Sequence, residues 1–334
     1  MTTKLLQFVN QKKEMPNKRG KVLRLKDFNE IYNEFNEAEA KKQAGRCSQC
    51  GIPFCQVHCP LQNNIPDWLK LAAENRFKEA HEVSQSTNNF PEICGSICPQ
   101  DRLCEGNCVI EKGFESVTIG RVEKHINDIA WKKGWVYPVK PTKEINKSIG
   151  IIGSGPAGLS AAEQLRKNGY KVEIYDRYDR PGGLLIYGIP NFKLEKYVVE
   201  RRTEILKKGG IIFHNNFEVG KTKPFDFLKN KHDAILIATG VYKARELDIS
   251  DVSSTDIIPA LNFLITSNKK GLGDKVQEFD NGELNAKNKN VVVIGGGDTA
   301  MDCVRTAVRQ NAKSVKCLYR RDRENIPGSL REVY

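Results

Sequence analysis

Eight of the ten cysteines in the chain lie between Arg46 and Cys108. They form two compact sets, Cys47-x2-Cys50-x4-Cys55-x3-Cys59 and Cys94-x3-Cys98-x5-Cys104-x3-Cys108. So many thiols in so short a span need a common physical role. Disulfide bonds, zinc and iron–sulfur clusters are the three candidates, and each makes this segment fold around a different kind of cross-link.

Two of the three roles fit poorly. Structural disulfides need an oxidising compartment. The N-terminal stretch has no apolar core and soon becomes charged, which predicts no secretory signal and a cytoplasmic location. Zinc sites usually combine one Cys-x2-Cys pair with a second pair a dozen or more residues later. Here Cys55 and Cys59 follow the pair Cys47 and Cys50 too closely for that pattern.

Iron–sulfur clusters fit the pattern best. Cysteine runs that end in Cys-Pro are typical of bacterial ferredoxin sites. Both sets contain this dipeptide, as Cys59-Pro60 and Cys98-Pro99. Eight thiolates in two sets suffice for two [4Fe-4S] clusters, so the sequence favours a cluster-binding domain.

Length and charge narrow the class of protein. The 334 residues are enough for two or three domains. No apolar run approaches the roughly 20 residues that a membrane helix needs. Lys and Arg outnumber Asp and Glu by 53 to 41, but no basic cluster with interleaved aromatic residues suggests a nucleic-acid site. The net positive charge suits phosphate-bearing cofactors or an acidic partner.

Helical patterns flank the cysteine sets. We expect helices within Phe28–Ala44, from Pro66 to about Ala80, and from Val117 to about Lys133. In the last of these, Glu123 lies on surface next to the apolar face and can point inward. Cysteine loops tied together by short helices, followed by a Pro-containing linker from Trp135 to Ser148, are therefore predicted for the first part of the chain.

After the linker the sequence pattern changes from cysteine-rich loops to alternating strands and helices. A short apolar strand runs into a glycine-rich turn and a helix, and a second strand ends in Asp176. This is a dinucleotide-binding fingerprint in its proper context. Gly153 permits the tight turn, Gly155 lets the backbone approach a pyrophosphate, and Gly158 lets helix and strand pack closely. Asp176 is expected to accept hydrogen bonds from a ribose. The candidate contacts of this turn are Gly153, Ser154, Gly155, Pro156, Ala157 and Gly158.

A glycine pair follows the fingerprint. Gly182 and Gly183 allow another close approach of the backbone to a ligand. We include Leu184, Lys193 and Val219 among the candidate cofactor contacts of this region.

A second fingerprint begins with the strand Asn290–Ile294. Its turn and first helical residues supply the candidate contacts Gly295, Gly297, Asp298, Thr299 and Ala300. The next strand ends in Arg320 and Arg321 instead of an acid. Arginines at this point suit a 2′-phosphate, whereas an acid suits a 2′-hydroxyl, so this site is predicted to prefer NADPH.

Two nucleotide folds in series predict two nucleotides, FAD in the first and NADPH in the second. A flavin is the required converter, because a hydride carries two electrons and a cluster accepts one. Cys303 and Cys317 are single cysteines that we expect in the core. Without a Cys-x-x-Cys pair near either nucleotide fold, the sequence argues against a thiol–disulfide reductase.

The whole chain resembles the small (beta) subunit of NADPH-dependent bacterial glutamate synthase. The strings that carry the resemblance are Cys47-Ser-Gln-Cys50-Gly-Ile-Pro-Phe-Cys55, Cys104-Glu-Gly-Asn-Cys108, Gly182-Gly-Leu-Leu-Ile-Tyr-Gly-Ile-Pro190, Gly295-Gly-Gly-Asp-Thr-Ala300 and Tyr319-Arg-Arg-Asp322. The resemblance implies a subunit that oxidises NADPH at FAD and sends electrons through its clusters to a large (alpha) subunit. There, glutamine and 2-oxoglutarate would become two glutamates.

The same module resembles the N-terminal part of dihydropyrimidine dehydrogenase. That resemblance implies ligand sets that cross between the two cysteine sets. One cluster would take Cys47, Cys50, Cys55 and Cys108, and the other would take Cys59, Cys98, Cys104 and Glu123. Cys94 would then be spare, whereas the cysteine pattern alone would make Cys94 the eighth ligand.

The predicted fold class is α+β multidomain, with a helical iron–sulfur domain before two Rossmann-like domains. We expect the cluster domain at residues 1–140, the FAD domain at 141–285 and the beginning of the NADPH domain at 286–334. Members of the resembling family continue beyond the position of Tyr334, so we expect the second nucleotide domain to be incomplete in this chain.

Two other functions stay open at this point. The same NADPH–FAD–iron–sulfur module can serve a different oxidoreductase partner, of the pyrimidine-reducing or transhydrogenase type, because the substrate site would lie on another chain. A zinc-stabilised interaction protein that binds nucleotides without turnover is the alternative from another class. The identity of the bound metal, zinc or iron, distinguishes this zinc-stabilised protein from the redox modules.

Overall fold

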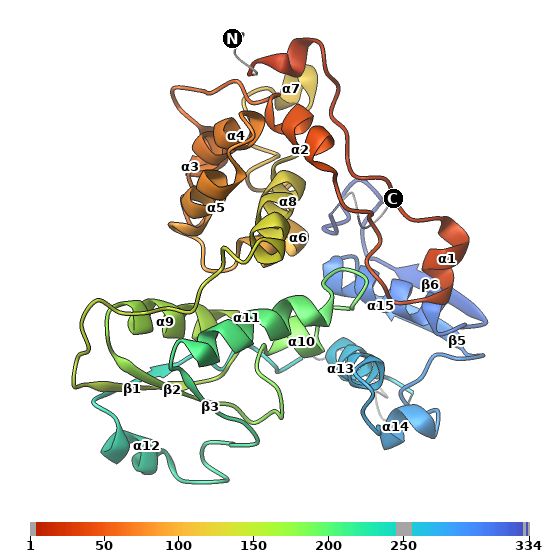
Figure 1. Ribbon diagram of the computed structural model, residues 1–334. Coiled ribbons are helices and arrows are strands. Elements are labelled where there is room, and N and C mark those ends of the chain that lie inside the picture. Colours follow the sequence, from red (N-terminus) through yellow and green to blue (C-terminus); the bar gives the residue numbers. More distant parts are fainter. Residues whose placement is uncertain (1–4, 245–255, 330–331, 333–334) are drawn as a thin grey trace. The chain divides into compact units, whose positions relative to one another are not determined.

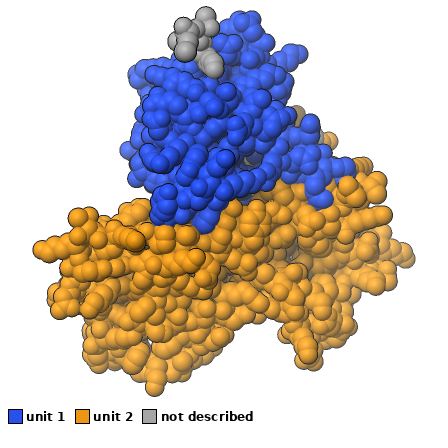
Figure 2. Space-filling model, in the orientation of Figure 1, with its two compact units in different colours: residues 1–20, 31–137 blue, residues 21–30, 138–334 orange. Residues whose placement is uncertain are grey.

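The computed structural model describes residues 5–244, 256–329 and 332. The chain divides into two compact units, one made of residues 1–20 and 31–137 and the other of residues 21–30 and 138–334 (Figure 2). The segment 21–30 thus belongs with the second unit, although its sequence position precedes the cysteines. The domain boundaries at 140 and 285 stay predictions.

The first unit is helical (Figure 1). Its elements are η1 (Gln7–Val9), α2 (Glu37–Ala44), α3 (Phe54–Val57), α4 (Ile65–Ala73), α5 (Phe77–Gln85), α6 (Pro91–Ile97), α7 (Glu111–Phe114) and α8 (Ile119–Lys132). Proline stands in the first turn of α4 and of α6, where its missing N–H costs nothing. Short helices of this kind leave most of the cysteines on the loops between them, while Cys55 lies within α3 and Cys94 within α6.

The helix predicted within Phe28–Ala44 is shorter than expected. Asn36 starts α2 through a capping box, in which its side chain accepts from the Glu39 N–H at 2.9 Å and Glu39 accepts from the Asn36 N–H at 3.0 Å. Before this cap the chain is irregular, and the Arg19 N–H donates to the Ile31 carbonyl at 2.9 Å. Ile31 is buried as its apolar pattern predicted, but from a non-helical segment.

The single helix predicted from Pro66 to Ala80 is two helices. Asn75 adopts a left-handed conformation with φ 68°, which ends α4 and lets the chain turn into α5. Asparagine tolerates this conformation better than most residues. In α8, by contrast, Ile119, Val122 and Ile126 are buried on one face, as their spacing predicted.

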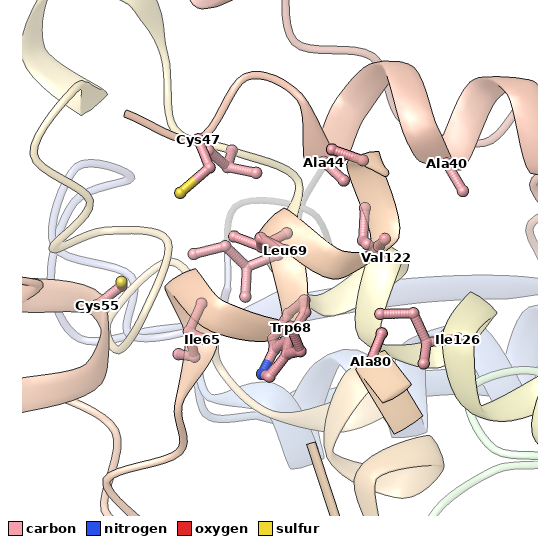
Figure 3. Close-up of a cluster of buried hydrophobic side chains, with 14 of the residues drawn as sticks. Ala40, Ala44, Cys47, Cys55, Ile65, Trp68, Leu69, Ala80, Val122 and Ile126 are labelled. Atoms are coloured by element: carbon pink, nitrogen blue, oxygen red, sulfur yellow. The ribbon is translucent and has the colours of Figure 1, made fainter. Parts of the chain in front are cut away.

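Trp68 lies at the centre of the first unit's core (Figure 3). Its indole N–H donates to the Asn63 side chain at 2.7 Å, and Asn63 donates to the Ser84 carbonyl at 2.7 Å. The indole N–H and the Asn63 amide are therefore both paired within this core. Cys47 and Cys55 lie at the edge of the same cluster, so the tryptophan core supports the loops that carry the thiols.

The second unit contains two parallel sheets (Figure 1). Its elements are α1 (Lys21–Lys26), β1 (Ser148–Ile152), α9 (Pro156–Lys167), β2 (Lys171–Tyr175), α10 (Leu184–Tyr187), α11 (Lys196–Lys208), β3 (Ile212–His214), α12 (Phe225–Lys231), β4 (Ala234–Ile237), α13 (Ala260–Gly271), α14 (Gln277–Asp280), β5 (Asn290–Ile294), α15 (Asp298–Arg309) and β6 (Ser314–Leu318). The first sheet has the order β3-β2-β1-β4, and the second pairs β5 with β6.

The order β3-β2-β1-β4 places β1 in the interior of its sheet, where Ile151 is fully buried. In the register, Gly150 lies opposite Glu173 of β2 and Ile235 of β4. Helix α9 connects β1 to β2 and covers one face, while α12 lies on the other (Figure 1). Ligands of such sheets bind beyond the carboxyl ends of the strands, which is where the two glycine-rich turns begin.

Candidate functional site

Four predicted ligand cysteines, drawn from both sequence sets, surround one cavity in the first unit. The cavity is lined by Cys47, Cys50, Cys55 and Cys108, together with apolar side chains that include Leu69, Val117 and Ile119. Cys108 is far from the other three in sequence, so the fold brings it to them. Burial raises the pKa of Cys55 to about 12 and also raises the pKa values of Cys47 and Cys108. Cluster binding would therefore have to displace protons from these thiols.

Arg46 holds the loops around this cavity together. Its side chain is fully buried, and its guanidinium donates to the carbonyls of Gln11, Phe114, Glu115 and Ser116. Among the residues that the structure describes, no carboxylate lies within ion-pair distance of this cation. A buried charge that meets only neutral carbonyls is costly. Thiolates and a cluster of net negative charge beside Cys47 would compensate it, so the surroundings fit an anionic cluster.

A second group gathers around Glu123 on α8. Glu123 is buried, and the Asn88 side chain donates to its carboxyl at 3.2 Å. Burial, aided by the nearby Cys94, raises the pKa of Glu123 well above its ordinary value. The Cys94 thiol in turn lies 3.6 Å from the Asn88 side-chain oxygen, to which it donates. Both candidates for the eighth ligand thus lie at the same place.

Cys59, Cys98 and Cys104 lie near the same group. Burial raises the pKa of Cys104 well above its ordinary value, and the neighbouring Glu123 and Cys59 raise it further. Cys94 is hydrogen-bonded to Cys98, which is the main cause of its own raised pKa. The structure therefore brings Cys59, Cys98 and Cys104 together with both Cys94 and Glu123, and the choice between these last two stays a prediction.

In the described parts of the chain, no three Cys, His, Asp or Glu side chains are arranged to hold a single metal ion. A cubane cluster spreads its four protein ligands over four irons, so its ligand sulfurs lie further apart than those of one tetrahedral ion. Four cysteines that line one cavity fit the ligand number of such a cluster.

The first glycine-rich turn has the geometry that the fingerprint predicts. Gly153 has φ +104°, and a Cβ at Gly158 would lie 2.0 Å from the Gly153 carbonyl oxygen. Only glycine fits at these two positions. A Cβ at Gly155, by contrast, would meet nothing within 4 Å, so the space beside it is open at the N-terminus of α9. Pro156 begins that helix and Ala157 follows it, which leaves the first backbone N–H groups free for a phosphate.

The glycine pair lies against this turn. The Gly182 N–H donates to the Ser154 carbonyl at 2.9 Å. A Cβ at Gly183 would lie 2.7 Å from the Gly155 Cα. The two loops are therefore in backbone contact, and Leu184 begins α10 immediately afterwards. Side chains larger than hydrogen would separate the two loops.

Asp176 makes hydrogen bonds to the neighbouring loops that the sequence did not suggest. One of its carboxylate oxygens accepts from both the backbone N–H and the hydroxyl of Ser154, each at 2.6 Å. The other accepts from the Tyr178 N–H at 2.9 Å. Asp176 thus fixes the conformation of the glycine-rich turn. The oxygen that accepts from Tyr178 has a second lone pair, and a ribose contact stays a prediction.

Lys193 is paired with acidic side chains. Its ammonium lies 3.1 Å from an Asp302 carboxylate oxygen on α15 and 3.8 Å from a Glu332 oxygen. Val219 lies in a turn where it forms a bridge with Lys223. For neither residue does the structure identify a role in holding a nucleotide, so both stay predictions.

Lys196 is a residue that the sequence analysis missed. It begins α11, its side chain is buried, and its ammonium donates to the carbonyls of Leu185, at 3.1 Å, and Ile189. Burial lowers its pKa to about 7. It thereby ties α11 to the segment that follows the glycine pair. An isolated lysine at a helix start gives no sequence signal for such burial.

The second glycine-rich turn repeats the geometry of the first. Gly295 has φ +134°, and a Cβ at Gly297 would meet nothing within 4 Å. Asp298 begins α15, with Thr299 and Ala300 in its first turn, and its carboxylate accepts from the Ser329 N–H at 2.8 Å. Arg320 and Arg321 follow β6 and are exposed, which leaves them accessible to a phosphate.

The two remaining cysteines differ from each other. Cys303 is buried on α15, as expected. The expectation that Cys317 is a core residue is wrong, because it is exposed on β6, where its thiol donates to the Gly295 carbonyl at 3.1 Å. Its sheet has only two strands among the described residues, so no further strand pairs with the second edge of β6 there.

Two family models match the chain. Residues 24–135 match the model described as dihydropyrimidine dehydrogenase domain II, 4Fe-4S cluster, and residues 147–332 match the pyridine nucleotide-disulphide oxidoreductases. The predicted fold class is confirmed, as are the classes of cofactor and of enzyme: iron–sulfur, flavin and pyridine nucleotide in an oxidoreductase. The cysteines within the second match, Cys303 and Cys317, do not form a Cys-x-x-Cys pair.

Curated relatives extend over nearly the whole chain. The small chain of glutamate synthase [NADPH] from Azospirillum brasilense is 62% identical over 99% of this chain and 69% of the relative. The one from Escherichia coli is 47% identical over 100% of this chain and 70% of the relative. A putative oxidoreductase of Escherichia coli, AegA, is 44% identical over 95% of this chain and 48% of its own length. The chain therefore belongs to the family of the small chain of NADPH-dependent glutamate synthase.

Proposed function

We propose that this chain is the electron-input subunit of a glutamate synthase. It would oxidise NADPH at FAD and pass electrons through two [4Fe-4S] clusters to a large subunit. That partner would form two L-glutamate from L-glutamine and 2-oxoglutarate. The observation that carries the electron-transfer part is the cavity lined by Cys47, Cys50, Cys55 and Cys108 in a chain that also has two dinucleotide turns. The identity of the partner rests on the names of the relatives.

The proposed ligand sets follow from the two cysteine groups. Cys47, Cys50, Cys55 and Cys108 would hold one cluster, next to the buried cation of Arg46. Cys59, Cys98, Cys104 and Glu123 would hold the other, with Asn88 orienting the carboxyl by its hydrogen bond. Cys94 is the alternative to Glu123.

Each glycine-rich turn has a proposed nucleotide. The open side of Gly155 and the N-terminus of α9 would hold the FAD pyrophosphate, while Asp176 keeps Ser154 in place. Gly297 and the N-terminus of α15 would do the same for NADPH. Arg320 and Arg321 would neutralise its 2′-phosphate. Bound FAD would supply the conversion between two-electron hydride and single electrons.

An anaerobic spectroscopic experiment tests this function. The purified chain is mixed with one equivalent of NADPH or NADH, and bleaching of the flavin and cluster absorption is followed. We expect bleaching with NADPH and much slower bleaching with NADH. Adding the glutamate synthase large subunit with glutamine and 2-oxoglutarate should restore the oxidised spectrum and produce glutamate. Reoxidation without any glutamate formation would contradict the proposed partner.

A second candidate function has its own support. AegA resembles nearly all of this chain and is described as an oxidoreductase, not as a glutamate synthase. The same NADPH–FAD–iron–sulfur module would then reduce a different partner. Isolation of complexes from the native cell under anaerobic conditions distinguishes the two candidate functions. The partner chain would differ in mass, and the partner would act on a different substrate.

No helix in the described part of the chain is long and apolar enough to cross a membrane. The cytoplasmic location that the N-terminal sequence suggested stays a proposal.

A further inference from the structure

Gln49 lies inside the first cysteine motif, between Cys47 and Cys50. Its side-chain amide donates to the Cys47 sulfur at 3.2 Å and to the Pro66 carbonyl at 2.8 Å. Its backbone N–H donates to the same sulfur. One residue thus directs two N–H groups at one of the proposed cluster ligands.

The backbone at Gln49 is unusual for a residue with a side chain. It has φ 51°, in the left-handed region that favours glycine. Holding a non-glycine residue there is energetically unfavourable. A glycine stands two positions later, at Gly51, where φ is not in that region. The position of this turn that favours glycine is therefore occupied by Gln49, although a glycine lies only two residues away.

The contact with Pro66 fixes the direction of the amide. Pro66 belongs to the first turn of α4, the helix that carries the buried Trp68. One amide hydrogen is held by this rigid helix, so the other is directed at the sulfur. Ser48 also approaches a sulfur, at 2.9 Å from Cys50, but its hydroxyl can either donate or accept. The Gln49 amide nitrogen can only donate.

A donor directed at a ligand sulfur changes the energetics of reduction. Reduction adds one negative charge to the cluster and its thiolates, and a hydrogen bond to sulfur stabilises the more negative state. Hydrogen bonds to the sulfurs are among the features that set cluster potentials. Removing the donor should therefore make the cluster harder to reduce.

We propose that Gln49 is a positioning residue that raises the reduction potential of the cluster held by Cys47, Cys50, Cys55 and Cys108. It does so through its hydrogen bonds to the Cys47 sulfur, with its side chain anchored on α4. This inference rests on the proposed function, because it requires a cluster in the cavity.

The test is a redox titration followed by electron paramagnetic resonance, with the full chain purified anaerobically. Gln49→Leu removes the side-chain donor. Gln56→Leu is the matched control, because Gln56 neighbours the ligand Cys55 but donates to the Gln62 carbonyl and the Asn64 side chain, at 3.3 and 3.0 Å. Iron and acid-labile sulfide are measured for each protein, so that potentials are compared only at equal loading.

We expect Gln49→Leu to lower the midpoint potential of one cluster and leave the other unchanged. At a fixed applied potential the reduced-to-oxidised ratio of that cluster should fall about tenfold, which is about 59 mV for one electron. Gln56→Leu should titrate as the unmodified chain does. A fully loaded Gln49→Leu protein with unchanged potentials would overturn the inference.

If Gln49→Leu loses its cluster, a second variant tests whether Gln49 raises the reduction potential. Gln49→Glu keeps the size of the side chain and, at pH 8, replaces the donor by a carboxylate. It should lower the same potential, and an unchanged potential would overturn the inference. If the unmodified chain itself binds no iron and sulfide, the proposed function fails instead, so the two failures are distinguishable.

Discussion

Lys196 offers a quantitative test of the packing around the first glycine-rich turn. Its pKa of about 7 lies well below its ordinary value of 10.5, because the folded chain buries the ammonium. At 1.36 kcal/mol per pH unit, the charged form costs the fold about 5 kcal/mol. The perturbation is Lys196→Met, which keeps a long, flexible side chain and removes the charge.

The sign of the pH dependence follows from proton binding. Between pH 7 and 10.5 the unfolded chain keeps the proton on Lys196 that the folded chain has lost. The free energy of unfolding of the second unit should therefore rise with pH in this window, by about 1.4 kcal/mol per pH unit from this group. Below pH 7 both states are protonated, and the full cost is present. From pH 7, where the folded chain is half protonated, to pH 9 the expected gain is about 2 kcal/mol.

The assay follows the second unit by itself. Pulse-labelling hydrogen exchange of peptides from β1 and β2, across a urea series at pH 7, 8 and 9, gives its unfolding free energy. Lys196→Met also loses the hydrogen bonds to the Leu185 and Ile189 carbonyls. That loss is independent of pH, so it shifts the curve without changing its slope. The slope difference between the two proteins isolates the charge.

Lys208→Met is the matched control, because Lys208 lies on the same helix α11 and is exposed. It should keep the pH slope of the unmodified chain. Peptides from the first unit should show the same slope in all three proteins. Equal slopes in the unmodified chain and Lys196→Met would refute the assignment of a buried, largely neutral lysine.

Three further predictions concern the proposed cofactor sites. Gly158→Ala should abolish stoichiometric flavin binding, measured by absorption, since its Cβ would lie 2.0 Å from the Gly153 oxygen; Gly271→Ala, which meets nothing within 4 Å, should bind flavin normally. Retained flavin in the first variant would contradict the close packing. Replacing Arg320 and Arg321 together by alanine should raise the KM for NADPH at least tenfold and leave that for NADH nearly unchanged; an equal rise for both would argue against a 2′-phosphate site. Glu123→Ala should change the paramagnetic resonance of one cluster while Cys94→Ala leaves both unchanged, and the reverse pattern would make Cys94 the ligand.

Local chemistry made part of this structure predictable. The positive φ at Gly153 and the close packing at Gly158 follow from a turn that only glycine can form, so the fingerprint predicted them residue by residue. The buried face of α8 followed from its spacing, and with it the inward position of Glu123. These features depend on neighbours within a few positions of the chain.

Other features depend on contacts that sequence patterns do not contain. The break at Asn75 replaces one expected helix by two, because a single asparagine took a left-handed conformation inside a helical pattern. The bonds from Ser154 to Asp176 satisfy an acid that the fingerprint assigns to ribose. The burial of Lys196 depends on how α11 packs against the segment after the glycine pair, and the exposure of Cys317 depends on what packs against β6.

The measurement that tests the central claim most directly is metal and acid-labile sulfide analysis of the anaerobically purified chain. Two [4Fe-4S] clusters predict about eight iron and eight sulfide per chain. About one or two zinc without sulfide would make the cysteines structural. The electron-input function would then fail, and the two dinucleotide turns alone would remain.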